Sequence, residues 1–273
     1  MRLKRISNQT IIDSNSQSTW LFVLPGLLLV LLLGLPLTAL FLRAIGKDFF
    51  TYALSDTALF ALRLSLFTSL ISVIISIAIG TPLAYLLANW HFPGRAALEL
   101  LIDLPVVLPP SVAGLSLLIA FGRNGLFGAW LSKLGIALPF TTAAVVIAQT
   151  FVSAPLFVRS ARLGFAAIDP QLEEAAHVEG ATQWQLFSLI MLPLASRSII
   201  SGAILAWTRA LGEFGATILF AGNLEGTTQT MPLAIYLGFE HNLDVAVVLS
   251  VVLVLVSLVM LGVMRSLDGN RTH

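Results

Sequence analysis

Apolar residues gather into six long runs along the chain, separated by shorter segments that carry most of the charged residues. The runs cover residues 20–42, 60–89, 104–122, 141–160, 198–221 and 245–264. A helix needs about 20 consecutive apolar residues to cross the hydrocarbon core of a bilayer. An open strand cannot cross it, because its backbone groups would lack hydrogen-bond partners in lipid. The pattern therefore predicts an all-α polytopic membrane protein, with six transmembrane helices in a single domain over residues 1–273.

The first apolar run lies close enough to the N-terminus to be compared with a secretory signal peptide. It extends from Trp20 to Leu42 without a charged residue. The apolar region of a signal peptide has about 7–15 residues, so the greater length favours a retained transmembrane helix. Pro25 and Pro36 are expected near the ends of this helix or at a kink.

Composition supports a membrane protein and narrows the chemistry. Hydrophobic residues make up 57% of the chain and charged residues 11%, against about 25% charged in a soluble domain. The mean hydropathy is +0.93. A net charge of +1 with dispersed basic residues gives no sign of nucleic-acid binding. The chain has no cysteine, and its four histidines show no metal-ligand spacing.

The distribution of lysine and arginine predicts the orientation, because cytoplasmic loops carry an excess of both. An even number of spans places both termini on one side of the membrane. That side has nine basic residues and the other has four, so both termini are expected in the cytoplasm, in the cell (inner) membrane. The nine are Arg2, Lys4, Arg5, Arg95, Arg159, Arg162, Arg197, Arg265 and Arg271, and the four are Arg43, Lys47, Arg123 and Lys133.

Residues 168–197 form a charged cytoplasmic segment between two apolar runs. Asp169 is expected to cap a short helix that begins at Pro170, since proline is favoured at the first helical position. Gly180 is expected to end this helix in a left-handed conformation. Thr182 and Gln185 have the spacing of a capping box, which predicts a second short helix.

The second helix is expected to expose large apolar side chains outside the bilayer before Pro193 turns the chain back. Such side chains need a cover, which can be lipid headgroups, the protein's own helix ends or a partner. The residues alone leave open a loop that simply lies on the membrane surface. The side chains are Trp184, Leu186, Phe187, Ile190 and Met191.

The spacing within this segment resembles the EAA loop of binding-protein-dependent ABC importer permeases. The resemblance implies a type I ABC importer permease fold over essentially the whole chain, with residues 168–197 as the coupling loop that docks on an ATPase subunit. Small residues there would allow close approach of two backbones, and flanking aromatic residues would supply contact area. The matching and flanking positions are Glu174, Ala175, Ala176, Gly180, Ala181, Trp184, Ile190, Leu192 and Pro193.

Two stretches after the loop resemble the molybdate and tungstate permeases within that family. They are WTRALGEFGATILFAGN at 207–223 and GTTQTMPLAIY at 226–236. Sulfate permeases share the Arg-Ala-Leu-Gly-Glu-Phe-Gly core, so sulfate or another oxyanion stays as an alternative. LPVVLPPSVAGL at 104–115 is also similar to this group.

Arg209 and Glu213 are charged residues inside an apolar run, at the i, i+4 spacing of one helix face. A charge at the centre of a bilayer costs about 3 kcal/mol, so the two are expected to pair or to face water. They can line the pathway, or they can form an ion pair that fixes helix packing, which we favour. Gly212 and Gly215 are expected to allow close helix contact or a local break.

The chain carries no nucleotide site of its own, because its only Gly-Lys pair, Gly46-Lys47, lacks the rest of a phosphate loop. The resemblance implies a homodimer, two ATPase subunits that bind ATP and Mg, and an extracytoplasmic oxyanion-binding protein. The permease itself would perform no bond chemistry and would alternate between two packings of one bundle. A gradient-driven transporter that uses Arg209 and Glu213 as a proton-coupled pair is the remaining alternative.

Overall fold

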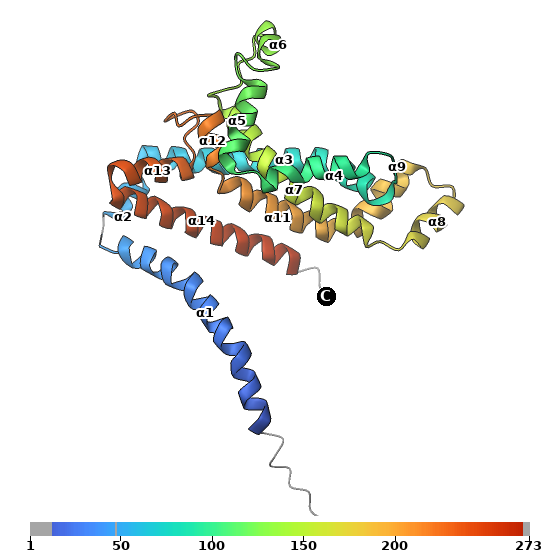
Figure 1. The fold of residues 1–273 in the computed structure, drawn as a ribbon, viewed down its shortest axis with the longest axis horizontal. Coiled ribbons are helices and arrows are strands. Elements are labelled where there is room, and N and C mark those ends of the chain that lie inside the picture. The colour runs from blue at the N-terminus through green and yellow to red at the C-terminus, as the bar shows by residue number, and fades with distance from the viewer. Residues whose placement is uncertain (1–12, 47, 270–273) are drawn as a thin grey trace, which may run out of the picture. The chain divides into compact units, whose positions relative to one another are not determined.

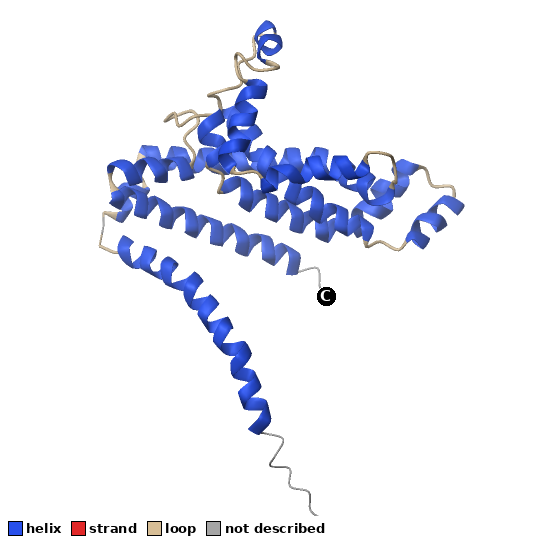
Figure 2. Cartoon of the chain, viewed as in Figure 1, coloured by secondary structure: helices blue, strands red, loops and turns tan. Residues whose placement is uncertain are grey.

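The computed structural model describes residues 13–46 and 48–269, and every regular element within them is a helix (Figures 1 and 2). The chain divides into two compact units, Met1–Phe49 and Phe50–His273, which are described separately. The single domain predicted over 1–273 stays a prediction. Several basic residues and one histidine counted above lie outside the described residues, as does the side chain of Arg265. They are Arg2, Lys4, Arg5, Lys47, Arg271 and His273.

The first unit contains one long helix, α1 (Asp13–Ala44), whose part from Leu21 to Ala44 is long and apolar enough to span a membrane. This agrees with the run predicted over 20–42. Pro25 and Pro36 both lie inside the helix. Large apolar side chains are exposed along this helix; Leu21, for example, is 73% exposed and Phe22 is 79% exposed.

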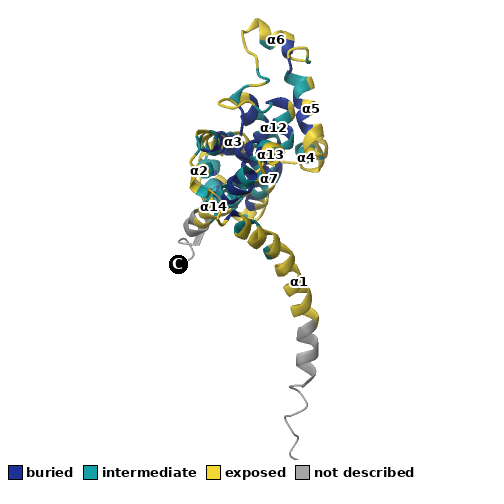
Figure 3. Cartoon of the chain, turned by 90° about the vertical axis from the view of Figure 1, so that its left-hand side faces the viewer, coloured by how far each residue is buried: buried dark blue, intermediate teal, exposed yellow. Residues whose placement is uncertain are grey.

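The second unit is built around α3 (Asp56–Asn89), α7 (Thr142–Ala166) and α11 (Ser196–Leu211), which pack against one another. Figure 1 shows α14 (Leu243–Gly269) beside α11, and α13 (Met231–His241) packs on α14. Buried residues concentrate inside this bundle, whereas α4 and α6 are mostly exposed (Figure 3).

Small and hydroxylated residues let the central helices approach closely. Ser72 Oγ on α3 donates to the carbonyl oxygen of Val146 on α7 at 3.1 Å. Ser65 Oγ accepts from the backbone N–H of Met231 at the start of α13, at 2.7 Å. A Cβ on Gly164 would lie 2.4 Å from the Cβ of Ser198, so α7 and α11 meet where no larger residue fits. The hydroxyl groups of Ser65 and Ser72 on α3 therefore serve helix packing.

Two of the predicted spans are broken. α4 (Arg95–Val107) and α5 (Pro110–Phe121) meet at 117°, so the predicted 104–122 run does not form one straight helix. Leu108 is extended because it precedes Pro109, and Pro110 then begins the next helix. Among the described residues, four helices are long and apolar enough to span a membrane, or up to six if each of two bent pairs is one span. The second bent pair is Gln183–Leu194 with Ser196–Leu211, which meet at 69°.

The predicted 198–221 run is interrupted as well. α11 ends at Leu211, and α12 (Gly215–Phe220) begins after a three-residue break. α12 packs on α5, so the helices that follow the two breaks meet each other. The remaining short helices are α2 (Phe49–Ala53), α6 (Gly128–Lys133) and α8 (Pro170–Val178), with α9 (Gln183–Gln185), η1 (Leu186–Met191) and α10 (Leu192–Leu194) in the predicted coupling loop.

Candidate coupling loop and buried ion pair

The local structure of the loop follows the predicted caps. Asp169 Oδ1 accepts from the backbone N–H of Gln171 at 3.0 Å, at the start of α8. Gly180 has a φ of +81°, the left-handed conformation that ends the helix. Thr182 and Gln185 form both hydrogen bonds of the capping box at the start of α9. Because these bonds are local, the sequence alone was enough to predict them.

The predicted exposure of the second helix is only partly right. Trp184 is 72% exposed, but Leu186 and Met191 are buried at 0% and 2%, and Phe187 and Ile190 are half-buried. The segment Leu186–Met191 is a π-helix, whose wider turn changes which side chains face the bundle. The prediction that the helix exposes Leu186 and Met191 is therefore wrong; of the three covers considered for these side chains, the chain's own core supplies it.

An aromatic cluster ties the loop to two bundle helices. The ring of Phe187 lies 5.0 Å from that of Tyr85 on α3 and 6.3 Å from that of Phe165 on α7, centroid to centroid. Tyr85 and Phe165 meet edge to face at 5.4 Å, and Trp184 lies 5.8 Å from Phe187. Offset and edge-to-face aromatic pairs are favourable beyond their buried area, so this cluster fixes the loop against the ends of α3 and α7.

The motif positions fall into distinct environments. Ala176 is 7% exposed and packs in the chain's own core, so its small side chain serves this chain's packing. A Cβ on Gly180 would meet nothing within 4 Å, so its positive φ is what requires glycine. Glu174, Ala175, Trp184 and Pro193 are exposed, whereas Ala181, Ile190 and Leu192 are half-buried.

Four further exposed apolar side chains of the loop were missed from the sequence. Val178 is 87% exposed and Leu189 is 70% exposed, on either side of Trp184 in the chain, and Leu172 and Leu194 are exposed to a lesser extent. We call the three most exposed of these side chains, Val178, Trp184 and Leu189, the apolar surface of the loop. A pattern of apolar positions cannot separate these from Leu186 and Met191, because the π-turn decides which ones point inward.

Arg209 and Glu213 do form an ion pair, with Arg209 Nη1 2.5 Å from Glu213 Oε2. The pair does not lie on one helix face, because α11 ends at Leu211 and Glu213 follows it. Glu213 Oε1 accepts from the backbone N–H of Ala216 at 2.7 Å, so the carboxylate caps the start of α12. Glu213 is 1% exposed, whereas the Arg209 side chain is 34% exposed.

The glycines beside this pair have different surroundings. A Cβ on Gly215 would lie 2.5 Å from the Cβ of Pro110 at the start of α5, and one on Gly114 would lie 2.7 Å from the carbonyl oxygen of Ala216. Close contact of α5 and α12 therefore requires glycine at both positions. Gly212 is exposed and lies in the break itself. We call this contact of the first turns of α5 and α12 the α5–α12 crossing.

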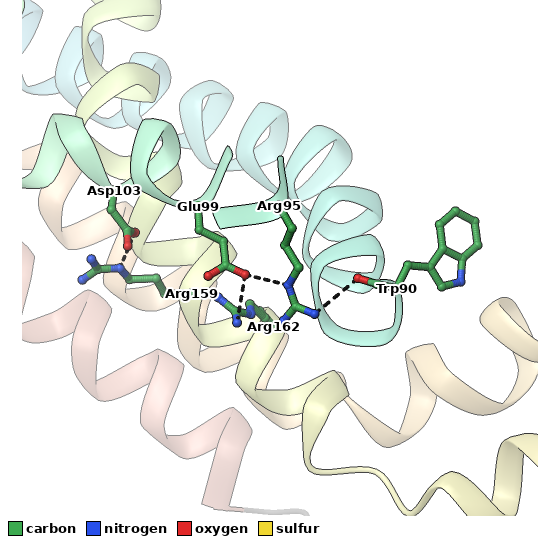
Figure 4. A network of polar contacts seen from close by, with 6 residues as sticks. All are labelled: Trp90, Arg95, Glu99, Asp103, Arg159 and Arg162. Carbon is green, nitrogen blue, oxygen red and sulfur yellow. Dashed lines mark hydrogen bonds and ion pairs between the residues drawn. The ribbon is translucent and has the colours of Figure 1, made fainter. Parts of the chain in front are cut away.

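A network of ion pairs, not foreseen from the sequence, joins α4 to α7 (Figure 4). Glu99 Oε1 lies 2.8 Å from Arg95 Nε and 3.1 Å from Arg162 Nη2. Asp103 Oδ1 lies 2.5 Å from Arg159 Nε. Arg95 and Glu99 have the local i, i+4 spacing, but the partners that join α4 to α7 are far apart in the sequence, so no local pattern indicates those two pairs. Among the described residues, no group of three or more His, Asp or Glu could hold a metal ion.

Comparison with protein families decides the class of this molecule. Residues 80–272 match the family described as binding-protein-dependent transport system inner membrane component. The chain belongs to this family of transport permeases. As a permease of this family, it is a transport component and an inner-membrane protein.

Individual relatives of this permease cover most of its length. It is 41% identical over 245 residues to the molybdenum transport system permease protein ModB of Mycobacterium tuberculosis, covering 89% of this chain and 92% of the relative. It is 34% identical over 260 residues to the sulfate transport system permease protein CysT of Escherichia coli, covering 90% and 94%.

The fold is that of solved importer structures. A chain from a bacterial alginate ABC transporter, solved in complex with alginate pentasaccharide-bound periplasmic protein, superposes with a TM-score of 0.78 at 20% identity, over 94% of the permease and 96% of that chain. This likeness confirms the predicted type I ABC importer permease fold.

Proposed function

We propose that this permease is the membrane subunit of an ATP-driven importer for molybdate or tungstate. The observation that carries the proposal is the 41% identity to ModB over nearly the full length of both chains. The lower identity to CysT makes sulfate the second candidate. Two copies would enclose the pathway, two ATPase subunits with ATP and Mg would bind on the cytoplasmic side, and an oxyanion-binding protein would deliver substrate outside.

The apolar surface of the loop supports a docked ATPase. Val178, Trp184 and Leu189 are exposed although the loop carries charged residues and lies at the ends of α7 and α11. Exposed aromatic and aliphatic side chains on a polar segment mark an interaction site. The aromatic cluster around Phe187 would carry a movement of this surface directly to α3 and α7.

The geometry at Glu213 argues against a gradient-driven transporter. One carboxylate oxygen pairs with Arg209 and the other caps α12, so both are engaged inside the chain. A proton-coupled acid would have to leave both partners in each cycle. Arg209 and Glu213 therefore serve to hold the break between α11 and α12, and the substrate passes without binding this carboxylate.

ATP-dependent uptake of labelled molybdate tests the substrate. The complete importer, with its ATPase and binding protein, is placed in liposomes, and unlabelled tungstate or sulfate is added as competitor. We expect competition by tungstate and none by sulfate. Competition by sulfate alone would assign the sulfate function, and uptake driven by a proton gradient without ATP would refute the importer.

Substitution of Trp184 tests the docking surface. An aromatic hot spot in an interface contributes about 2 kcal/mol or more, which corresponds to about thirtyfold in affinity. We expect Trp184→Glu to weaken binding of the ATPase subunit by about that factor, because the side chain is 72% exposed and contacts the aromatic cluster only at its edge, through Phe187. Glu179→Gln, another exposed residue of the same loop, is the control. Equal ATPase binding by both variants would contradict the proposed surface.

A further inference from the structure

We propose that Glu99 and Asp103 clamp α4 to α7, and that this clamp transmits movement of the coupling loop to the α5–α12 crossing. The inference rests on the coupling role proposed above and assigns positioning residues to it. The clamp consists of the pairs Arg162–Glu99 and Arg159–Asp103, with Arg95 as a second partner of Glu99.

The two pairs are matched in spacing along both helices. Glu99 and Asp103 are one turn apart on the same face of α4, and Arg159 and Arg162 are about one turn apart on α7. Figure 4 shows the two acids of α4 pointing toward the two arginines of α7. Two parallel contacts fix the direction of one helix against the other, whereas a single pair would leave it free to pivot.

Arg95 strengthens the arrangement from the start of α4. Its Nε donates to Glu99 Oε1, and its Nη1 donates to the carbonyl oxygen of Trp90 at 3.3 Å. Trp90 ends α3, so the same side chain links α3, the turn and α4. A carboxylate held by two guanidinium groups is more strongly oriented than one in a single pair.

Apolar packing alone holds α4 weakly. No residue of α4 is buried, and Leu100, Leu101 and Val107 are 72%, 64% and 77% exposed. An open pocket of about 430 Å³, lined by Ile102 on α4 and Val158 on α7, also contains the side chains of the ion pairs. Leu98 and Ile102 of α4 pack against the bundle core, so the ion pairs reinforce a limited apolar contact between α4 and α7.

The two helices that the clamp joins lead to the coupling loop on one side and to α5 on the other. α7 ends at Ala166 and passes through a short turn into α8, the first helix of the coupling loop. α4 ends at Val107 and passes through Leu108 and Pro109 into α5. A displacement of the loop that shifts the end of α7 would therefore move α4, and α4 would carry α5 against α12.

Charge exchange at one pair tests the clamp. Asp103→Arg and Arg159→Asp are made singly and together in the complete importer, with ATPase and binding protein, in liposomes. This pair is chosen because Asp103 bonds Arg159 alone among the described residues, whereas Glu99 is shared. Lys133→Gln removes a charge from an exposed position elsewhere and serves as the control.

The first measurement does not depend on the substrate. Ser116→Cys, at an exposed position on α5, provides the one thiol of a chain that otherwise has no cysteine, and its labelling rate is followed with and without ATP. We expect ATP to change this rate in the parent, each single exchange to reduce that change by about tenfold, and the double exchange to restore it. The second measurement is the amount of molybdate carried per ATP hydrolysed. This ratio should be reduced in each single exchange and restored in the double exchange.

The outcomes separate the clamp from the substrate assignment. Single exchanges that respond like the parent, or a double exchange as defective as the singles, would overturn the clamp. A parent whose α5 labelling ignores ATP would overturn it too. A parent that carries no molybdate but shows ATP-dependent labelling would refute the substrate alone, and the labelling results would still decide the clamp.

Discussion

Replacing Arg209 and replacing Glu213 should destabilise the permease to different extents, although the two residues form one ion pair. Glu213 is 1% exposed, whereas the Arg209 side chain is 34% exposed. Replacing Glu213 by Gln leaves an arginine that is already partly exposed and retains an oxygen to cap α12. Replacing Arg209 by Gln leaves a buried carboxylate without its cation. We therefore expect Arg209→Gln to destabilise the permease more than Glu213→Gln.

The magnitude follows from the surroundings of each group. Removing one partner of a buried ion pair costs about 3–5 kcal/mol when the remaining charge has no other partner. Glu213 keeps one hydrogen bond, from the N–H of Ala216, so Arg209→Gln should cost somewhat less, about 2–3 kcal/mol. Glu213→Gln should cost about 1 kcal/mol, because the partly exposed arginine tolerates the loss better than a buried charge would. Glu213→Ala removes the cap as well and should cost about 1 kcal/mol more than Glu213→Gln.

Thermal unfolding of the purified permease in detergent measures this order. The decisive variant combines Arg209→Gln with Glu213→Gln, because removing the buried charge should recover part of the stability lost by Arg209→Gln alone. The reasoning is refuted if Arg209→Gln is no less stable than Glu213→Gln. It is also refuted if the double variant loses, relative to the parent, the full sum of the stabilities lost by the two single variants.

Three further predictions concern particular positions. Gly215→Ala should destabilise the permease by about 1–3 kcal/mol, because the new Cβ would lie 2.5 Å from the Cβ of Pro110. Gly212→Ala, at an exposed position, should be near neutral, and thermal unfolding of the two variants measures the difference. Gly180→Ala should cost about 1–2 kcal/mol at a φ of +81°, and Gly180→Asn less, measured by unfolding and by ATPase binding. In cells that express the permease without its ATPase, Val178→Cys, at a position that is 87% exposed, should react with a membrane-impermeant reagent in inside-out vesicles and not in intact cells; the reverse would overturn the predicted orientation.

The local features of this permease were predictable from its sequence, because their interactions connect residues a few positions apart. Asp169, Gly180 and the Thr182–Gln185 capping box formed as expected. The apolar runs likewise predicted the long helices α3, α7 and α14. In lipid, a helix is the structure in which a single segment can form all of its own backbone hydrogen bonds. The breaks at Pro109 and Gly212 were signalled by residue type, although the 117° bend between α4 and α5 was not.

The tertiary structure decided what depends on distant segments meeting. Leu186 and Met191 look as exposed in the sequence as Trp184, yet a π-turn and packing against the bundle bury them. Asp103 meets Arg159, which lies 56 positions further along the chain, and no periodicity within either helix reveals that pairing. Glu213 has the spacing of a simple helix pair, but the end of α11 makes it the cap of α12. Local bonds are determined by neighbouring residues, whereas burial and partner choice are determined by which helices pack together.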